Sequence, residues 1–147
     1  MKNKTKYKKY YIHINKPQIE VNDFEFYEIS KLNKLKDNSI SEVLIYDLLE
    51  YINYVDIYEI FKTITEKVMV DGKIHIQGTD LKSLCLAVLD SQIDSNIFRS
   101  ILFGLNKKNI MSLNDTRKLI DSFSNITVNK IKFLNGVQYY IECLKNE

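Results

Sequence analysis

The chain has 147 residues, which at roughly 100–200 residues per domain indicates one domain with room for a small appendage. Hydrophobic residues make up 45% and charged residues 27%, a balance that excludes disorder, a collagen-like chain and a coiled coil as the whole structure. The formal charge is only +2, no apolar run reaches the ~18 residues of a membrane helix, and no apolar signal core follows the N-terminus, so we expect a cytoplasmic protein without membrane contact.

The N-terminal residues carry a concentrated positive charge. Five lysines fall within the first nine residues, at Lys2, Lys4, Lys6, Lys8 and Lys9. We therefore predict a basic flexible tail over residues 1–9 and a single domain over residues 10–147. Such a tail would bind nucleic acid only through the phosphate charge. Sequence-specific recognition is not favoured, because Arg99 and Arg117 are the only arginines and arginine is the residue that best recognises guanine and phosphate.

Two short strands are predicted after the tail. Residues 10–14 and 24–29 alternate apolar and polar side chains, which is typical of strands. Asn15-Lys16-Pro17 breaks the first strand, because proline lacks the N–H that a sheet requires and keeps the preceding residue extended. Only nine residues, 15–23, separate the strands. This connection is too short for a usual crossover helix.

The middle of the chain predicts a strand–helix–strand unit over residues 42–77. Residues 30–39 are polar and loop-like, and residues 42–46 form an apolar run typical of a strand covered on both faces. Asp56 precedes a helix whose apolar residues recur at i, i+3, i+4 and i+7. Asp71-Gly72 should end that helix, and residues 73–77 should form the next strand. The two strands of the unit are expected to be parallel.

The second half of the chain predicts three helices and a hairpin. The helices should begin after Thr79 or Asp80, after Asp94 or Ser95, and after Asn114, because these residue types cap helix N-termini. Asn135-Gly136, between two strand-like segments, is the strongest short signal for a β-hairpin. Residues 81–105 are rich in apolar side chains. We interpret them as core with a modest interface, so a protein partner or self-association is plausible.

Cysteine and histidine give no metal-binding pattern. The spacing of Cys85, Cys143, His13 and His75 matches no zinc signature, and no metal site is predicted. Both cysteines lie in apolar surroundings and are expected to be buried free thiols. Both histidines lie in strand-like segments, where they are expected to be packed side chains rather than ligands.

The order of these elements resembles a small, shortened class I S-adenosylmethionine-dependent methyltransferase. The similarity covers residues 10–144. IHINKPQIEVNDFEFYEI (12–29) matches the first strand, the glycine loop and the second strand of that family. LKDNSISEVLIYDLLEYI (35–52) matches its Asp-Asn-Ser run, apolar strand and Leu-Glu-His segment, and VMVDGKIHI (68–76) matches its Leu-Lys-Pro-Gly-Gly segment and following strand. The resemblance implies an α/β, Rossmann-like methyltransferase fold with a mixed, mostly parallel sheet and a C-terminal antiparallel hairpin.

The resemblance also implies a cofactor site for S-adenosylmethionine. Its first loop would be Asn15, Lys16 and Pro17, and the acid that holds the ribose hydroxyls would be Glu28. Lys36 and Asp37 would lie on the adenine side, and Asp47 would face the same crevice beyond the strand ends. The alternative interpretations are an exposed acid at the start of a loop for Glu28, a surface turn at 36–38, and a helix-capping role for Asp47.

The first loop departs from the family pattern. Asn15 and Pro17 stand at glycine positions, where the family needs a close approach of the backbone to the cofactor. Two functions therefore follow from the sequence. The chain is either a methyltransferase for an unidentified acceptor, or a catalytically inactive protein of the same fold that acts as a structural or regulatory subunit (a pseudoenzyme).

Overall fold

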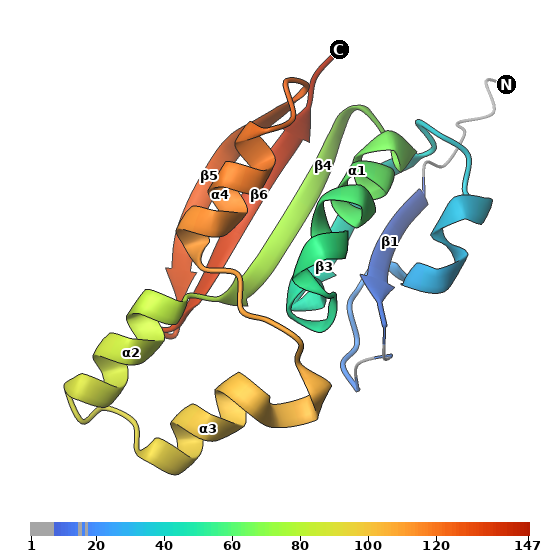
Figure 1. Ribbon diagram of the computed structural model, residues 1–147. Coiled ribbons are helices and arrows are strands. Elements are labelled where there is room, and N and C mark those ends of the chain that lie inside the picture. Colours follow the sequence, from blue (N-terminus) through green and yellow to red (C-terminus); the bar gives the residue numbers. More distant parts are fainter. Residues whose placement is uncertain (1–7, 15, 17) are drawn as a thin grey trace, which may run out of the picture.

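A six-stranded mixed sheet forms the centre of the protein (Figure 1). The computed structural model describes residues 8–14, 16 and 18–147. The strand order is β2-β1-β3-β4-β6-β5. The first four of these are parallel, and β6 joins β4 and β5 in antiparallel orientation. The strands are β1 (Lys8–His13), β2 (Glu25–Glu28), β3 (Ile40–Tyr46), β4 (Val68–Thr79), β5 (Ile126–Leu134) and β6 (Gln138–Lys145).

In the part of the chain that the structure describes, four α-helices and four 3₁₀ helices connect the strands. They are η1 (Ile29–Lys34), η2 (Leu48–Tyr51), η3 (Tyr54–Asp56), α1 (Ile57–Lys67), α2 (Leu81–Leu89), α3 (Ser95–Phe103), η4 (Gly104–Asn106) and α4 (Leu113–Asp121). The parallel pairing of β3 and β4 around α1, and the hairpin of β5 and β6, confirm two predictions. None of the helices in the described residues has the length and apolarity to cross a bilayer.

Several predicted boundaries are wrong by a few residues. The segment 30–39 is not a plain loop, because η1 occupies its first half, up to Lys34. Ser112, not Asn114, caps α4, and its hydroxyl accepts from the backbone N–H of Asp115. Lys8 and Lys9 belong to β1 and not to the tail, and residues 1–7 lie outside the described part of the chain.

The turn predicted at Asp71-Gly72 lies inside β4. Helix α1 already ends at Lys67, and β4 begins at the next residue. The register between β3 and β4 shifts at this place, and Asp71 has a left-handed backbone with φ 62°. A Cβ at Gly72 would approach the Val68 side chain to 2.6 Å. The dipeptide therefore makes a bulge in a strand, where glycine is needed for the close approach.

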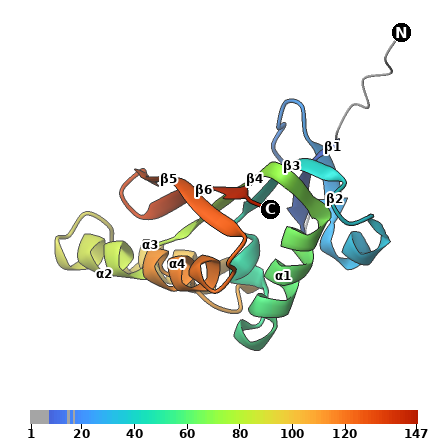
Figure 2. The same ribbon diagram turned by 90° about the horizontal axis from the view of Figure 1, so that it is seen from above.

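The helices all lie on one face of the sheet, as Figure 2 shows. That face carries the apolar core, in which β3 contributes Val43 and Ile45 and α1 contributes Phe61 and Ile64. β3 is buried on both faces at Val43, Leu44 and Ile45, as predicted, but no helix in the described residues covers the second face. The reason is the short β1–β2 connection, which contains no helix in its described residues. Leu44 faces the other side of the sheet and is buried by neighbouring side chains alone.

The open face of the sheet is lined by a polar and aromatic network. His75 of β4 lies at its centre, with Nε2 2.7 Å from Glu42 Oε1 and Nδ1 2.6 Å from the Tyr140 hydroxyl. Lys9 forms an ion pair with the same Glu42 at 2.7 Å. Because these four residues come from four strands, the network stabilises the register of the sheet on the face that no helix in the described residues covers. The prediction that His75 is a packed histidine is confirmed.

Helices α2 and α3 protrude from the body of the protein (Figure 1). Asp80 and Asp94 cap them as predicted, each accepting backbone N–H groups in the first turn. The prediction that residues 81–105 are mainly core is wrong, since α3 has no buried residue and α2 has only Leu84 and Ala87. Cys85 on α2 is exposed, also against expectation, whereas Cys143 is buried. Burial depends on what packs against a helix, and here the rest of the chain covers little of either one.

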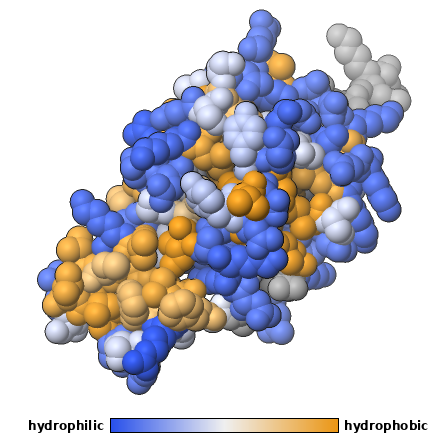
Figure 3. All heavy atoms as spheres, in the orientation of Figure 1, coloured by the Kyte–Doolittle hydropathy of each residue, from blue (hydrophilic) through white to orange (hydrophobic). Residues whose placement is uncertain are grey.

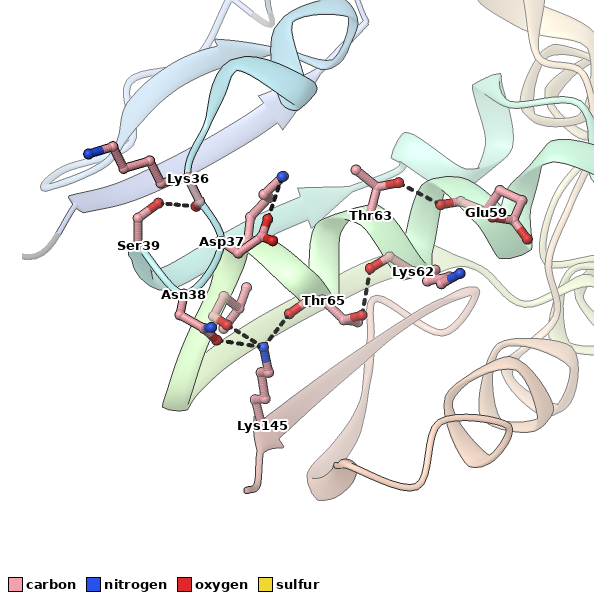
Figure 4. A network of polar contacts seen from close by, with 11 residues as sticks. Lys36, Asp37, Asn38, Ser39, Glu59, Lys62, Thr63, Thr65 and Lys145 are labelled. Carbon is pink, nitrogen blue, oxygen red and sulfur yellow. Dashed lines mark hydrogen bonds and ion pairs between the residues drawn. The ribbon is translucent and has the colours of Figure 1, made fainter.

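The amino end of the sheet is closed by Lys145, seen in Figure 4. Its buried Nζ donates to the backbone oxygens of Thr65 at 2.9 Å and Val68 at 2.7 Å, and to Asn38 Oδ1 at 3.0 Å. The backbone N–H of Asn38 donates to the Glu66 oxygen at 3.0 Å. The last carbonyls of α1, which lack partners within the helix, are thus satisfied by a side chain and a loop.

We expect Lys145→Ala to lower the free energy of unfolding by about 2 kcal/mol. The substitution leaves two buried carbonyls without a donor. Part of that cost is offset, because burial lowers the pKa of Lys145 and its charge is itself unfavourable there. Urea denaturation followed by circular dichroism measures the change. Lys130→Ala, on the exposed side of β5, is the control, and equal effects of the two variants would contradict this role for Lys145.

Candidate functional site

The carboxyl ends of β1 and β3 border the largest cavity described. The chain passes from β1 to β2 on one side, and β3 lies on the other side of β1. Such a switch point is where open α/β sheets bind ligands. The cavity measures about 550 Å³, within the usual range for small-molecule sites. Its lining residues are Tyr11, His13, Ile14, Lys16, Gln18, Tyr46, Asp47, Leu48, Tyr51 and Asn106.

Asp47 is the buried carboxylate of this cavity. It follows β3 directly and has a left-handed backbone with φ 55°, which aspartate tolerates better than most residues. Its Oδ1 is buried and has no hydrogen-bond partner among the residues that the structure describes. Burial raises the pKa of Asp47 to about 6, the charge of Glu50 adds to this, and Lys107 opposes it. Asp47 is therefore an acceptor ready for a polar ligand group. The side chain of Asp47 makes no capping hydrogen bond, so the alternative interpretation of Asp47 as a helix cap is wrong.

Glu50, three residues after Asp47, is a second buried acid, and it is paired. It is 1% exposed, its Oε1 accepts from the backbone N–H of Thr79 at 2.7 Å, and its Oε2 lies 2.6 Å from Lys107 Nζ. Its backbone oxygen accepts from Lys108 and Asn109. The carboxylate thus joins η2, the end of β4 and the segment 107–109. The sequence analysis missed this residue, although an acid placed directly between the apolar pair Leu48-Leu49 and Tyr51-Ile52 was a usable signal.

Aromatic rings form the wall of the same cavity. Tyr11 packs edge-on against Tyr46, with ring centroids 5.7 Å apart, and also contacts Phe26 at 5.3 Å. Burial raises the pKa of Tyr11 to about 12, so its hydroxyl stays protonated. The Nδ1 atom of His13 is buried, without a partner in the described part of the chain. Tyr11, Tyr46 and His13 therefore line the cavity with aromatic side chains.

Glu28 and Lys16 lie near this cavity in different ways. Lys16 lines it, with Nζ 5.1 Å from the centre of the Phe26 ring. Glu28 ends β2, is exposed, and does not line the cavity. The hydroxyl of Ser30 donates to Glu28 and, with Lys31 nearby, lowers its pKa. A second cavity of about 330 Å³ lies beside the first, shares Ile14 and Tyr51 with it, and includes Ser30.

The structure brings some of the predicted site residues together and separates others. Lys16 and Asp47 share the large cavity, and Glu28 lies at the same edge of the sheet. Lys36 and Asp37 precede β3 and therefore lie at the opposite, amino end, where Asp37 pairs with Lys67 at 2.6 Å (Figure 4). The surface-turn interpretation agrees with that position. Asn15 and Pro17 lie outside the described residues.

Comparisons with known proteins identify the fold. No family model and no curated protein sequence matches the chain. Solved structures match it over most of its length. One is a SAM-dependent methyltransferase, possible histamine N-methyltransferase, from Thermotoga maritima, with 15% identity and a TM-score of 0.62 over 95% of this chain and 82% of that one. The PH0226 protein from Pyrococcus horikoshii has 19% identity and a TM-score of 0.62 over 84% of this chain and 60% of that one.

A third match is an enzyme with a ligand. Magnesium protoporphyrin IX methyltransferase from Synechocystis, with bound S-adenosylhomocysteine (SAH), has 15% identity and a TM-score of 0.57 over 85% of this chain and 52% of that one. The fold is that of the S-adenosylmethionine-dependent methyltransferases. This confirms the predicted Rossmann-like fold with its mixed sheet. The chain spans only 60% of the Pyrococcus protein and about half of the Synechocystis enzyme.

Proposed function

We propose that the chain binds S-adenosylmethionine between the ends of β1 and β3 and transfers its methyl group to a nucleophilic acceptor. The observation that carries the proposal is the cavity at the switch point of a methyltransferase fold, whose lining includes Asp47 with its buried Oδ1 unpaired among the described residues. The matched proteins named as methyltransferases support the same function.

The lining residues fit the chemical groups of this cofactor. Asp47 suits its ammonium group, and Lys16 suits its carboxylate. The ring faces of Tyr11 and Tyr46 suit a sulfonium cation, which aromatic rings attract. Glu28 at the same edge would accept the ribose hydroxyls, once these replace Ser30 as its partner.

The chain itself would contribute binding and orientation. The sulfonium of the bound cofactor supplies a methyl group with a good leaving group. Asp47 and Lys16 would hold the amino-acid end, and the tyrosine wall would exclude water from the methyl group. Holding two reactants at the right distance supplies much of the rate in such reactions. No acid–base pair is required of the protein for the transfer.

Calorimetric titration of SAH into the purified protein tests this proposal. We expect a micromolar dissociation constant at pH 7.5. Asp47→Asn should raise that constant at least about tenfold, because it removes the negative charge facing the ammonium group. For the same reason binding should weaken between pH 7 and pH 5 as Asp47, with a pKa of about 6, becomes protonated.

The matched control is Asp71→Asn. Asp71 has the same left-handed backbone, with φ 62°, and is exposed within β4. Its substitution should leave SAH binding unchanged. No binding of SAH at millimolar concentration would refute the proposal and favour the catalytically inactive alternative, which Asn15 and Pro17 at glycine positions of the first loop first suggested.

A further inference from the structure

A large apolar surface covers helices α2 and α3. Figure 3 shows it at the lower left of the molecule, in the place that Figure 1 gives to these helices. Leu89 is 77% exposed and Phe103 is 76% exposed. The surface, called here the α2–α3 patch, consists of the exposed Leu81, Leu86, Leu89, Ile97 and Phe103. These side chains expose on the order of 500 Å², which is the size of the largest apolar patch on a typical monomer, and such patches are often functional.

Apolar side chains lie both on the side of α2 that faces the body of the protein and on the side that faces solvent. Leu84 and Ala87 face the body of the protein and are buried. Leu81 and Leu89 face outward. A helix with apolar side chains on both its inward and its outward side belongs in a core or an interface. Within the described residues, the body of the chain supplies only one of the two surfaces that α2 needs.

We propose that the α2–α3 patch binds the same patch of a second copy, so that two helical hairpins pack across a two-fold axis. The size fits this occupant. Each partner in a standard-size interface buries roughly 800 Å², and the exposed apolar side chains of α2 and α3 would supply the larger part of that area. The proposal does not depend on cofactor binding.

The charges around the patch also fit a second copy. The segment 81–103 contains two acids and two bases, and so has no net charge. In α2, Lys82 lies in the first turn and Asp90 follows the last. When α2 packs antiparallel to its copy, Lys82 of each chain faces Asp90 of the other. A two-fold interface is self-complementary in this way.

The same charges argue against a lipid surface as the occupant. Helices that bind a membrane interface carry several lysines or arginines on their polar side. Here Lys82 and Arg99 are balanced by Asp90 and Asp94. An anionic membrane would therefore gain no net attraction from this segment.

Sedimentation equilibrium of the full chain tests the proposal. Between about 1 and 100 µM, the mass should rise toward twice 17.4 kDa. Leu89→Glu combined with Phe103→Glu should raise the dissociation constant at least about 100-fold, because two charges would be buried in an apolar interface. Both side chains are exposed, so circular dichroism should show an unchanged fold. Val55→Glu, at a residue that is 83% exposed on η3, is the control and should not alter the mass.

A charge exchange tests the antiparallel geometry. Lys82→Asp should weaken the dimer, and Lys82→Asp with Asp90→Lys should restore it. A protein that stays monomeric at 100 µM, a dimer that survives Leu89→Glu with Phe103→Glu, or an equal loss with Val55→Glu would overturn the proposal. So would a failure of the charge exchange to restore the dimer. Monomers that co-sediment with phosphatidylglycerol vesicles would overturn it in favour of a membrane.

Discussion

Replacing Glu50 with alanine should lower the free energy of unfolding by about 3–5 kcal/mol, the range for breaking a buried ion pair. The carboxylate is 1% exposed and the Lys107 side chain is 13% exposed. The alanine variant would leave the Lys107 charge without its partner and the backbone N–H of Thr79 without an acceptor. An unpaired buried group costs more than the pair contributes, which is why the expected loss is large.

Urea denaturation of four variants separates the two contacts of Glu50. Glu50→Gln keeps an acceptor for Thr79 and should cost less than Glu50→Ala. Adding Lys107→Met to Glu50→Gln should recover part of the loss, because no charge is then left unpaired. Glu59→Ala, an exposed glutamate on α1, should change stability by about 0.5 kcal/mol or less. A Glu50→Ala protein within 1 kcal/mol of the original would refute a structural role for this carboxylate.

Asp47→Asn should have the opposite effect and stabilise the protein above pH 7 by about 3 kcal/mol. Burial raises the pKa of Asp47 to about 6 in the folded state, from 3.8. Well below pH 3.8 the carboxyl is protonated in both states and costs nothing. Between pH 4 and pH 6 the unfolded state releases its proton first, so the stability contributed by Asp47 falls as pH rises. Above pH 6 the whole cost is present, and asparagine removes it.

The measurement is the difference in unfolding free energy between Asp47→Asn and the unaltered protein at several pH values. It should be close to zero at pH 3.5 and reach its plateau near pH 7. Asp71→Asn, at an exposed residue in the same backbone region, is the control and should change stability by about 0.5 kcal/mol or less. A constant difference for Asp47→Asn would show that its carboxyl is not held in an unfavourable environment.

Both predictions concern carboxylates that follow the carboxyl end of β3. Asp47 and Glu50 lie three residues apart, yet one carboxylate is paired and the other is not. The unpaired acid destabilises the fold, and proteins keep such groups at binding sites. If the proposed cofactor binds, its ammonium group would lower the pKa of Asp47, and the cost measured without ligand would become part of the binding energy.

Local sequence signals predicted the fold well. The unit of β3, α1 and β4 followed from the periodicity of its apolar residues, and the final hairpin followed from Asn135-Gly136. Both depend on neighbouring residues alone. Coverage of the sheet could not be predicted in this way. An apolar run such as β3 is buried whether helices or side chains such as Tyr11 and Tyr46 cover it.

The site was only partly predictable. Asp47 was found because residues that follow a parallel strand lie at its carboxyl end. The same rule, applied to Lys36 and Asp37, would have placed them at the amino end, since they precede Ile40. The exposure of α2 and α3 had no sequence signal, because apolar helices look alike whether a core or a second chain covers them.

The two outer strands of the sheet determine how far association can proceed. β2 has only four residues, and β5 is interrupted between Val128 and Lys130, where Asn129 is the extra residue of a bulge. Lys130 and Lys132 add charge to that border. Short, bulged and charged edges resist pairing with another sheet. Copies of this chain are therefore expected to meet through helices, in a closed pair, and not to extend their sheets into fibres.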